Sequence, residues 1–236
     1  MYRYEQHCPV ARAAEVVTET WTLLILRELL RGSERRADIA RGLPKMSSSL
    51  LALRLRTLEA AGLLTYLPGD NGEKRYRLTA AGRELRPIID QLGLWGQRWL
   101  DSPRVGDLDP ELLVFDICRE IDRARLPAQP LTVEIEFADA PPPRSWWLAL
   151  SGSGAVAHRT GPKPSVRTAV GVRLRCTLGA LAGVWQGRTT WLQAVRDQGI
   201  MLAGDPAAIR SAIDCLGTSR YAAVPRPAPA PPAESR

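Results

Sequence analysis

The sequence predicts an α+β protein in two parts: a helical front part that contains a β-hairpin, and a back part in which a sheet packs on helices. Three observations predict this class. Residues 43–82 read as a capped amphipathic helix followed by two short strands around a polar turn. Residues 131–176 contain runs in which apolar and polar side chains alternate, as they do in half-buried strands. Between these regions, residues 102–109 (SPRVGDLD) mark a change of domain.

Length and charge agree with this division. The chain has 236 residues, which is long enough for two separate cores, and its formal net charge is +7. Most of the positive excess lies in residues 1–104, which favours a polyanionic partner without choosing among polyanions. No apolar run approaches the roughly 18 residues of a membrane span, and the polar opening is unlike a signal peptide. We therefore expect a cytoplasmic protein without a membrane partner.

Three helices are expected before residue 43. The first runs from about Pro9 to Val17, with four inward side chains, Val10, Ala13, Ala14 and Val17. The second, residues 21–31, is apolar nearly all round and should be central, with Gly32 as its stop. Residues 35–41 form a third, short helix that precedes the turn at Pro44.

The next helix opens at Ser47, a residue type that caps helix N-termini well. At a spacing of 3.6 residues one stripe of this helix should face the core, namely Leu51, Leu55, Leu58 and Gly62. The opposite face carries small, hydroxylated and arginine side chains, Ser49, Ala52, Leu53 and Arg56. Such a face suits close approach to the edges of DNA bases.

A basic hairpin follows. Residues 63–67 form its first strand, residues 68–73 its turn, and residues 74–79 its second strand, with Tyr76 and Leu78 pointing inward. Lys74, Arg75 and Arg77 are placed at the rim, where they can touch phosphates. An isolated basic hairpin is more often an ordinary solvated hairpin. Joined to the capped helix, however, it gives the element order of a winged helix-turn-helix, which places one helix in the major groove.

These positions resemble the HxlR-type winged-helix transcription regulators, which are related to the MarR regulators. The residues that carry the resemblance are Cys8-Pro9-Val10, the run 21–29 (WTLLILREL), Leu43-Pro44, Ser47, Leu51, Arg54-Leu55, Leu58-Glu59, Gly62-Leu63, Tyr76, Leu78-Thr79 and Gly82. The chain departs from the pattern at Arg36, where an aromatic residue is usual, and at Lys45, where Gly is frequent. The resemblance implies double-stranded DNA as partner, and we expect the contacts from Lys45, Ser47, Ser48, Ser49, Ala52, Leu53, Arg56, Lys74, Arg75 and Arg77.

After the hairpin, Thr79 should cap a long helix that reaches about Leu100, with a kink at Pro87. Five apolar residues at spacings of three and four form a seam along it, Leu85, Ile88, Leu92, Trp95 and Trp99. The seam can close onto the back domain of the same chain or join two subunits. The resemblance favours a homodimer interface, made jointly with the helix at residues 9–17.

The cysteines and histidines do not suggest catalysis, a cofactor or a metal site. Cys118, Cys176 and Cys215 fall on apolar stripes and are expected in the core, and none shows a CxxC spacing. Cys8 precedes Pro9 at a helix start, where the helix dipole can lower the pKa of a thiol. Several members of the resembled family sense oxidants or electrophiles through a cysteine near this place. The resemblance therefore makes Cys8 a candidate redox sensor, although an inert helix-entry residue is favoured.

The back part should begin with a helix capped by Asp109 before Pro110, with four inward residues, Leu113, Ile117, Ile121 and Ala124. Strands are expected at residues 131–137, 145–151, 155–158 and 168–176. A single helix at 178–198, a short extended piece at 199–204 and a last helix opened by Asp205-Pro206 and ending at Leu216 complete the layout.

This part is similar, more weakly, to the sterol-carrier-protein-like domains. The residues that carry the similarity are Thr177-Leu178, Leu181, Trp185-Gln186-Gly187-Arg188, Ala194-Val195 and Leu202-Ala203-Gly204-Asp205. It implies an apolar small-molecule effector, for which Trp146, Trp147, Trp185 and Trp191 are candidate pocket residues. The same tryptophans can instead fill the core or contact a partner subunit, which is the favoured interpretation for each one.

The resulting organisation is a DNA-binding and dimerisation domain at 1–101, a linker at 102–109, an effector domain at 110–222 and a Pro-rich, disordered tail at 223–236. Two functions compete. One is a sequence-specific DNA-binding regulator, not an enzyme, whose back domain senses an apolar molecule. The other is a lipid or hydrophobe carrier whose winged domain serves assembly. The small-residue helix face with Arg56 and the basic hairpin favour the regulator.

Overall fold

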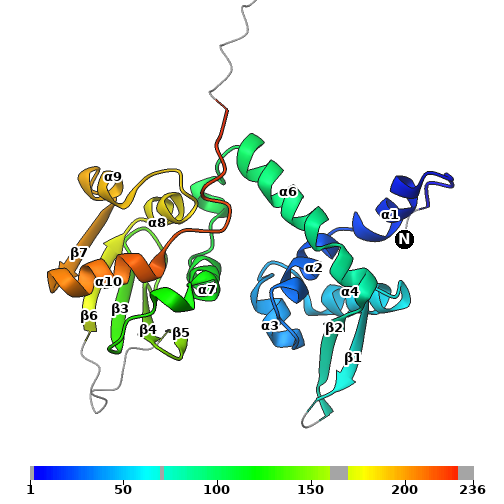
Figure 1. Cartoon of the computed structure of the whole chain (residues 1–236), viewed down its shortest axis with the longest axis horizontal. Coiled ribbons are helices and arrows are strands. Elements are labelled where there is room, and N and C mark those ends of the chain that lie inside the picture. The colour runs from blue at the N-terminus through cyan, green and yellow to red at the C-terminus, as the bar shows by residue number, and fades with distance from the viewer. Residues whose placement is uncertain (1–2, 70–71, 160–169, 228–236) are drawn as a thin grey trace, which may run out of the picture. The chain divides into compact units, whose positions relative to one another are not determined.

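The computed structural model describes residues 3–69, 72–159 and 170–227. The chain divides into two compact units, Met1–Leu94 and Trp95–Arg236, and each is described by itself (Figure 1). Helices and sheets occur in both, so the mixed α+β class is confirmed. The sequence-based boundaries at residues 101 and 109 stay predictions.

The first unit contains the helices and the hairpin that the sequence predicts. Its elements are α1 (Pro9–Val17), α2 (Thr22–Leu30), α3 (Arg36–Arg41), α4 (Ser48–Ala60), β1 (Leu64–Pro68), β2 (Lys74–Leu78), α5 (Ala80–Glu84) and the start of α6 (Arg86–Trp99). In its core, Ile25 and Leu26 of α2 pack with three buried leucines of α4, Leu51, Leu55 and Leu58. Gly62, expected on the same stripe, is exposed at φ +72° beyond the end of α4. It belongs to the turn, where a positive φ favours glycine.

The prediction of an inward stripe on α1 is wrong for two of its members. Val10 is 76% exposed, and Ala13 is exposed as well. Only Val17, at the end of the helix, packs against the core of the unit. The reason is that α1 meets the rest of the unit at its C-terminal end, which leaves its apolar side uncovered within one chain.

The helix after the hairpin is interrupted rather than only kinked. Thr79 caps α5 as expected, since its hydroxyl accepts a hydrogen bond from Gly82 N at 3.2 Å. The helix breaks at Leu85, and Pro87 stands in the first turn of α6. Proline has no N–H to donate to the preceding turn, whereas the first turn of a new helix requires none.

Gly82, one of the residues that matched the family pattern, permits the close approach of α5 to the hairpin. A Cβ atom at this position would overlap the carbonyl oxygen of Leu63. Because that oxygen belongs to the backbone, it cannot move aside as a side chain can. Thr79 reinforces the junction, with its hydroxyl donating to Gly62 O at 2.7 Å.

The second unit holds a five-stranded sheet with the order β5-β4-β3-β6-β7. β3 and β6 are parallel, and the other neighbouring pairs are antiparallel. The elements are α7 (Pro110–Glu120), β3 (Leu131–Phe137), β4 (Ser145–Ser151), β5 (Gly154–His158), β6 (Val170–Cys176), α8 (Leu178–Trp185), α9 (Trp191–Arg196), β7 (Ile200–Gly204) and α10 (Pro206–Leu216). The expected start of β6 at residues 168 and 169 lies outside the described residues.

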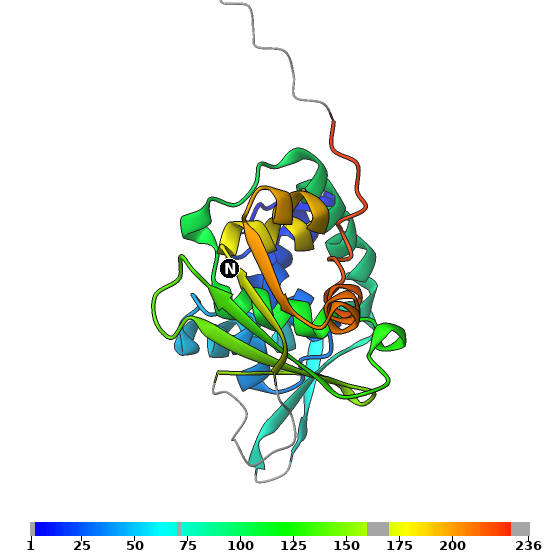
Figure 2. The same cartoon turned by 90° about the vertical axis from the view of Figure 1, so that its left-hand side faces the viewer.

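Helices cover one face of this sheet (Figure 2). Alternate strand residues such as Val133, Ile135 and Leu174 are buried there, against Ile117 of α7, Leu181 of α8 and other helix residues. The opposite face carries ion pairs, including Arg173 Nε with Glu134 Oε2 at 3.2 Å. This is the period-two alternation that the sequence predicts for a half-buried sheet.

Two helix predictions in this unit are wrong. The expected helix at 178–198 is divided into α8 and α9, because Gly187 adopts φ +69° and Thr190 caps a new helix through Gln193 N at 3.1 Å. Ala124, expected on the inward stripe of α7, is exposed because α7 ends at Glu120 and a short 3-10 turn follows. Within the described ranges, no helix combines the length and apolar character needed to cross a membrane.

Candidate nucleic-acid interface

The first turn of α4 is fixed by its own cap and by an arginine from α3. The Ser47 hydroxyl accepts a hydrogen bond from Leu50 N at 3.3 Å and lies 3.3 Å from the Ser49 hydroxyl. Arg36 Nη2 donates to both Ser48 O, at 2.6 Å, and Ser48 Oγ, at 2.9 Å. The departure from the family pattern at Arg36 therefore places an exposed guanidinium that ties α3 to α4.

The face of α4 that the sequence predicts for DNA is open to solvent. Ser49, Leu53 and Arg56 are exposed, and Ala52 is half-buried. Across the described residues, Arg56 has no hydrogen-bond or ion-pair partner. Arg54, two positions earlier, is engaged inside the unit, with Glu19 Oε2 at 2.7 Å and Thr20 O at 3.1 Å. Arg54 is therefore occupied by contacts within its own unit, whereas the Arg56 guanidinium is accessible to a binding partner.

A buried acidic residue positions the turn that leads into α4. The Glu28 side chain on α2 is fully buried, and its Oε1 accepts a hydrogen bond from Arg27 Nε at 3.0 Å. Arg27 Nη2 also donates to Gly42 O at 3.2 Å, and a Cβ atom on Gly42 would overlap the Glu28 carboxylate. This cluster was not predicted from the sequence. The one sequence feature that could have indicated the cluster is a single acidic residue, Glu28, between Arg27 and Arg31 in a mainly apolar helix.

The hairpin is extended by a third backbone segment. Tyr76 N donates to Glu34 O at 2.7 Å, and Arg35 forms an isolated antiparallel bridge with Arg75. Lys74 Nζ lies 3.5 Å from the ring centroid of Tyr66, and Arg77 Nε lies 3.2 Å from Glu34 Oε1. Because side chains alternate along a strand, Lys74 and Arg77 project from opposite faces of β2.

The remaining predicted DNA contact, Lys45, is exposed in the turn between α3 and α4. The structure therefore distributes the predicted set over this turn, α4 and β2. Arg36 is a further exposed cation beside the start of α4 that was not included in that set.

The seam on α6 is largely uncovered within one chain. Ile88, Leu92, Trp95 and Trp99 are 46–58% exposed, whereas Leu85 packs partly on the core of the first unit. Ile89, one residue away from the seam, is only 8% exposed and faces that core. The helix therefore has an inner apolar side and a separate outer one.

The four cysteines differ in accessibility. Cys8 is exposed in front of α1, and Cys118 is half-buried. Cys176 and Cys215 are buried as expected. Burial raises the pKa of the Cys176 thiol, and Asp139 and Glu136 raise it further. Burial also raises the pKa of the Cys215 thiol.

The structure does not bring the four candidate pocket tryptophans together. Trp146 is buried and packs edge-on against Phe137, with ring centroids 5.1 Å apart. Trp147 is the next residue along β4, so it projects from the other face of the sheet. Trp185 and Trp191 pack partly buried against the core on which Trp146 lies. This arrangement agrees with the alternative that three of the four help to fill the core.

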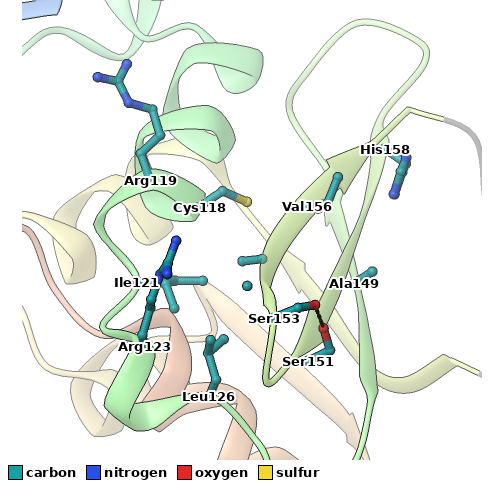
Figure 3. Close-up of a pocket in the computed structure, with 12 residues that line it drawn as sticks. Cys118, Arg119, Ile121, Arg123, Leu126, Ala149, Ser151, Ser153, Val156 and His158 are labelled. Carbon is teal, nitrogen blue, oxygen red and sulfur yellow. Dashed lines mark hydrogen bonds between the residues drawn. The ribbon is translucent and has the colours of Figure 1, made fainter. Parts of the chain in front are cut away.

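A cavity of about 510 Å³ instead lies between the end of α7 and the β4–β5 hairpin (Figure 3). Apolar side chains line part of it, among them Ile121, Leu126 and Val156. Polar groups line the rest, including Arg123, His158 and the Ser151 and Ser153 hydroxyls, which lie 2.7 Å from each other. None of the four tryptophans is among its lining residues.

Comparison with known proteins identifies the first unit. Residues 16–104 match the family described as HxlR-like helix-turn-helix. An uncharacterized HTH-type transcriptional regulator of Synechocystis sp. is 34% identical over 97 residues, which are 40% of this chain and 72% of that protein. YvaP of Bacillus subtilis, also an uncharacterized HTH-type transcriptional regulator, is 33% identical over 97 residues, covering 40% of this chain and 90% of the relative.

Among solved structures, the redox regulator HypR in its oxidized form is 30% identical, with 40% of this chain and 100% of that chain covered and a TM-score of 0.38. The capped helix, the basic hairpin and the match over residues 16–104 coincide on the same segment. The chain belongs to the HxlR-like helix-turn-helix family of DNA-binding transcriptional regulators.

Proposed function

We propose that this regulator is a homodimer that recognises a two-fold symmetric DNA sequence, with α4 in the major groove and the hairpin of β1 and β2 against the backbone. The observation that carries the proposal is Arg56, an exposed arginine on the small-residue face of α4 for which the described residues provide no partner. An exposed guanidinium without a protein partner can donate hydrogen bonds to both acceptors, O6 and N7, of a guanine in the major groove.

Phosphate contacts complete the proposal. Lys45, Lys74 and Arg77 are exposed around α4 and on the hairpin. Cations at such places fix the register of a protein on DNA without reading its sequence. Ser47, Ser48 and Ser49 add hydroxyl and backbone groups at the start of α4, where the helix dipole favours a phosphate.

The exposed seam on α6 supports the dimer. Four large apolar side chains at 46–58% exposure form a contiguous row that water would otherwise solvate. The uncovered apolar side of α1, with Val10 at 76% exposure, provides a second surface of the same kind. In a two-fold dimer the two surfaces together can form one self-complementary interface, which places the two α4 helices symmetrically.

A footprint of the purified protein on genomic fragments tests this function. We expect protection of two half-sites whose centres lie about 10 bp apart, or a multiple of that distance. Protection without a preferred sequence, or of a single half-site, would argue against a symmetric sequence-specific dimer.

We further propose that the second unit binds an apolar small molecule, as its similarity to sterol-carrier-protein-like domains implies. The cavity between α7 and the β4–β5 hairpin is the favoured location, because it combines apolar walls with a few polar groups. The comparisons lend no support to the alternative, a carrier protein whose winged part serves assembly alone.

A further inference from the structure

A second cavity, in the unit Trp95–Arg236, contains an unsatisfied cation. The Nε and Nη1 atoms of Arg188 are buried, and no hydrogen-bond acceptor reaches them within the described ranges. A buried donor without a partner is costly, and the cost is larger when the group carries a charge. Arg188 therefore differs from Arg173 and Arg175 on the open face of the sheet, which have glutamate partners.

The position of Arg188 is fixed by a tight turn. Gly187, immediately before it, adopts φ +69°, and a Cβ atom there would overlap Ala222. The segment that includes Ala222 is anchored nearby, since Ser219 N donates to Trp185 O at 2.6 Å. The chain after α10 is thus packed against the turn that follows α8, and the two together form one side of the cavity.

The C-terminal end of α6 forms the other side of the cavity, and Arg226 is hydrogen-bonded to it. Arg226 Nε donates to Gln97 O at 2.9 Å, and its Nη2 donates to Leu100 O. Gln97 Nε2 in turn donates to Gln186 O at 2.9 Å. The cavity is open to solvent on one side and has a volume of about 440 Å³, and both arginines line it together with Gln97 and Ser102. This size is suitable for a small metabolite.

The electrostatics of the cavity are positive. Burial lowers the pKa of the Arg188 guanidinium, the nearby Arg226 lowers it further, and Asp101 acts in the opposite direction. Asp101 thus offsets part of the positive charge at Arg188, but it makes no hydrogen bond to the buried nitrogens of that residue. An anion in the cavity would lie beside the Arg188 guanidinium and reduce the repulsion between the two arginines.

We propose that this cavity binds a small organic anion, a carboxylate or a phosphate ester, whose oxygens accept hydrogen bonds from Arg188 and are held electrostatically by Arg226. The planar guanidinium presents parallel N–H groups that match the oxygens of both ligand classes. The site is separate from the cavity at the β4–β5 hairpin and does not depend on the proposed DNA contacts.

Thermal unfolding and calorimetric titration of the full chain test the site. The probes are citrate and inorganic phosphate, each compared with sodium chloride at matched ionic strength. We expect a saturable rise in Tm with at least one probe and none with chloride, and the more effective probe identifies the carboxylate or the phosphate class. Arg188→Gln should weaken the apparent affinity by about tenfold or more, as the loss of a charged hydrogen bond predicts.

Arg210→Gln is the matched control, because this exposed arginine lies on α10 and outside the cavity lining. It should bind the probe as the unchanged chain does. If Arg188→Gln does not fold, Arg226→Gln decides, because Arg226 is exposed and its loss should also weaken binding. The proposal is overturned if neither probe acts beyond chloride, or if affinity survives in the variant that is tested.

Discussion

Arg54 and Arg56 lie two positions apart on α4 and illustrate how residue type alone does not determine role. Arg54 is held by Glu19 and the carbonyl of Thr20, so it connects α4 to the segment before α2. Arg56 is exposed without such partners in the described part of the chain. Two positions along a helix correspond to a rotation of about 200°, so the two side chains project from nearly opposite faces of α4. Only one of them is therefore expected to reach DNA.

Arg56→Ala should therefore reduce sequence discrimination. If Arg56 pairs with a guanine, the preferred site should lose on the order of 1–3 kcal/mol of binding free energy relative to a random sequence. Competition binding at constant salt measures this difference. Arg210→Ala, which removes the same charge from α10, is the control and should leave the discrimination unchanged. Equal selectivity in both variants would exclude a base contact by Arg56.

The cysteines give a second prediction at this scale. Because burial raises the pKa values of Cys176 and Cys215, both should remain protonated thiols at neutral pH and react slowly. Cys8 is exposed and should be the first to react with a maleimide. Mass spectrometry of partly labelled native protein checks the order, with denatured protein as the control for full labelling. Rapid labelling of Cys176 would contradict its packing in the core. Whether Cys8 senses oxidants stays a prediction.

At the scale of elements, the hairpin of β1 and β2 is expected to contact phosphates rather than bases. Changing Lys74, Arg75 and Arg77 to alanine should weaken binding to all sequences alike. The slope of log affinity against log salt should become less steep by roughly one unit for each phosphate that the altered hairpin no longer neutralises. A variant with Arg173, Arg175 and Arg210 changed to alanine removes three charges from the second unit and should keep the original slope. An unchanged slope in the hairpin variant would mean that the hairpin stays clear of DNA.

The α6 seam is expected to join two subunits. Leu92→Asp combined with Trp95→Ala should give a monomer with poor operator affinity, because a charge in an apolar interface is strongly unfavourable and one half-site supplies few contacts. Light scattering measures the mass of each species. Leu192→Asp is the control, since this leucine on α9 is 61% exposed and lies outside the seam. A dimer that persists in the double variant would reject the seam as the interface.

At the scale of the whole molecule, an effector can alter DNA binding only if its affinity differs between the free and the DNA-bound protein. Fatty acyl, sterol-like and aromatic ligands should be screened by tryptophan fluorescence with and without operator DNA. We expect one class to bind, with a dissociation constant that changes when the operator is present. Ile121→Arg, which places a charge in the cavity near the β4–β5 hairpin, should abolish that binding. Identical affinities in both states would show that the second unit has no sensing role.

Local chemistry accounts for what the sequence determined about this protein. The helix starts at Ser47, Thr79, Asp109 and Asp205 were predictable because each cap bonds an N–H within three residues of itself. The strand alternation in β3 and β6 was predictable because side-chain direction follows directly from the pleat. The segment that matches the HxlR-like family was recognisable for the same reason, since its helix, turn and hairpin are contiguous in the chain.

Only the tertiary structure decided the features that depend on distant neighbours. Burial of Glu28 beside Gly42, the exposure of Val10 and the packing of Trp146, Trp185 and Trp191 on one core depend on packing between elements. The same holds for Arg188 and Arg226, which are far apart in the chain yet line one cavity. A sequence pattern shows which face of an element is apolar, but it does not show what covers that face. For this reason the mixed α+β class and the capped helix at Ser47 were predictable, whereas the cavities and the partners of the arginines were not.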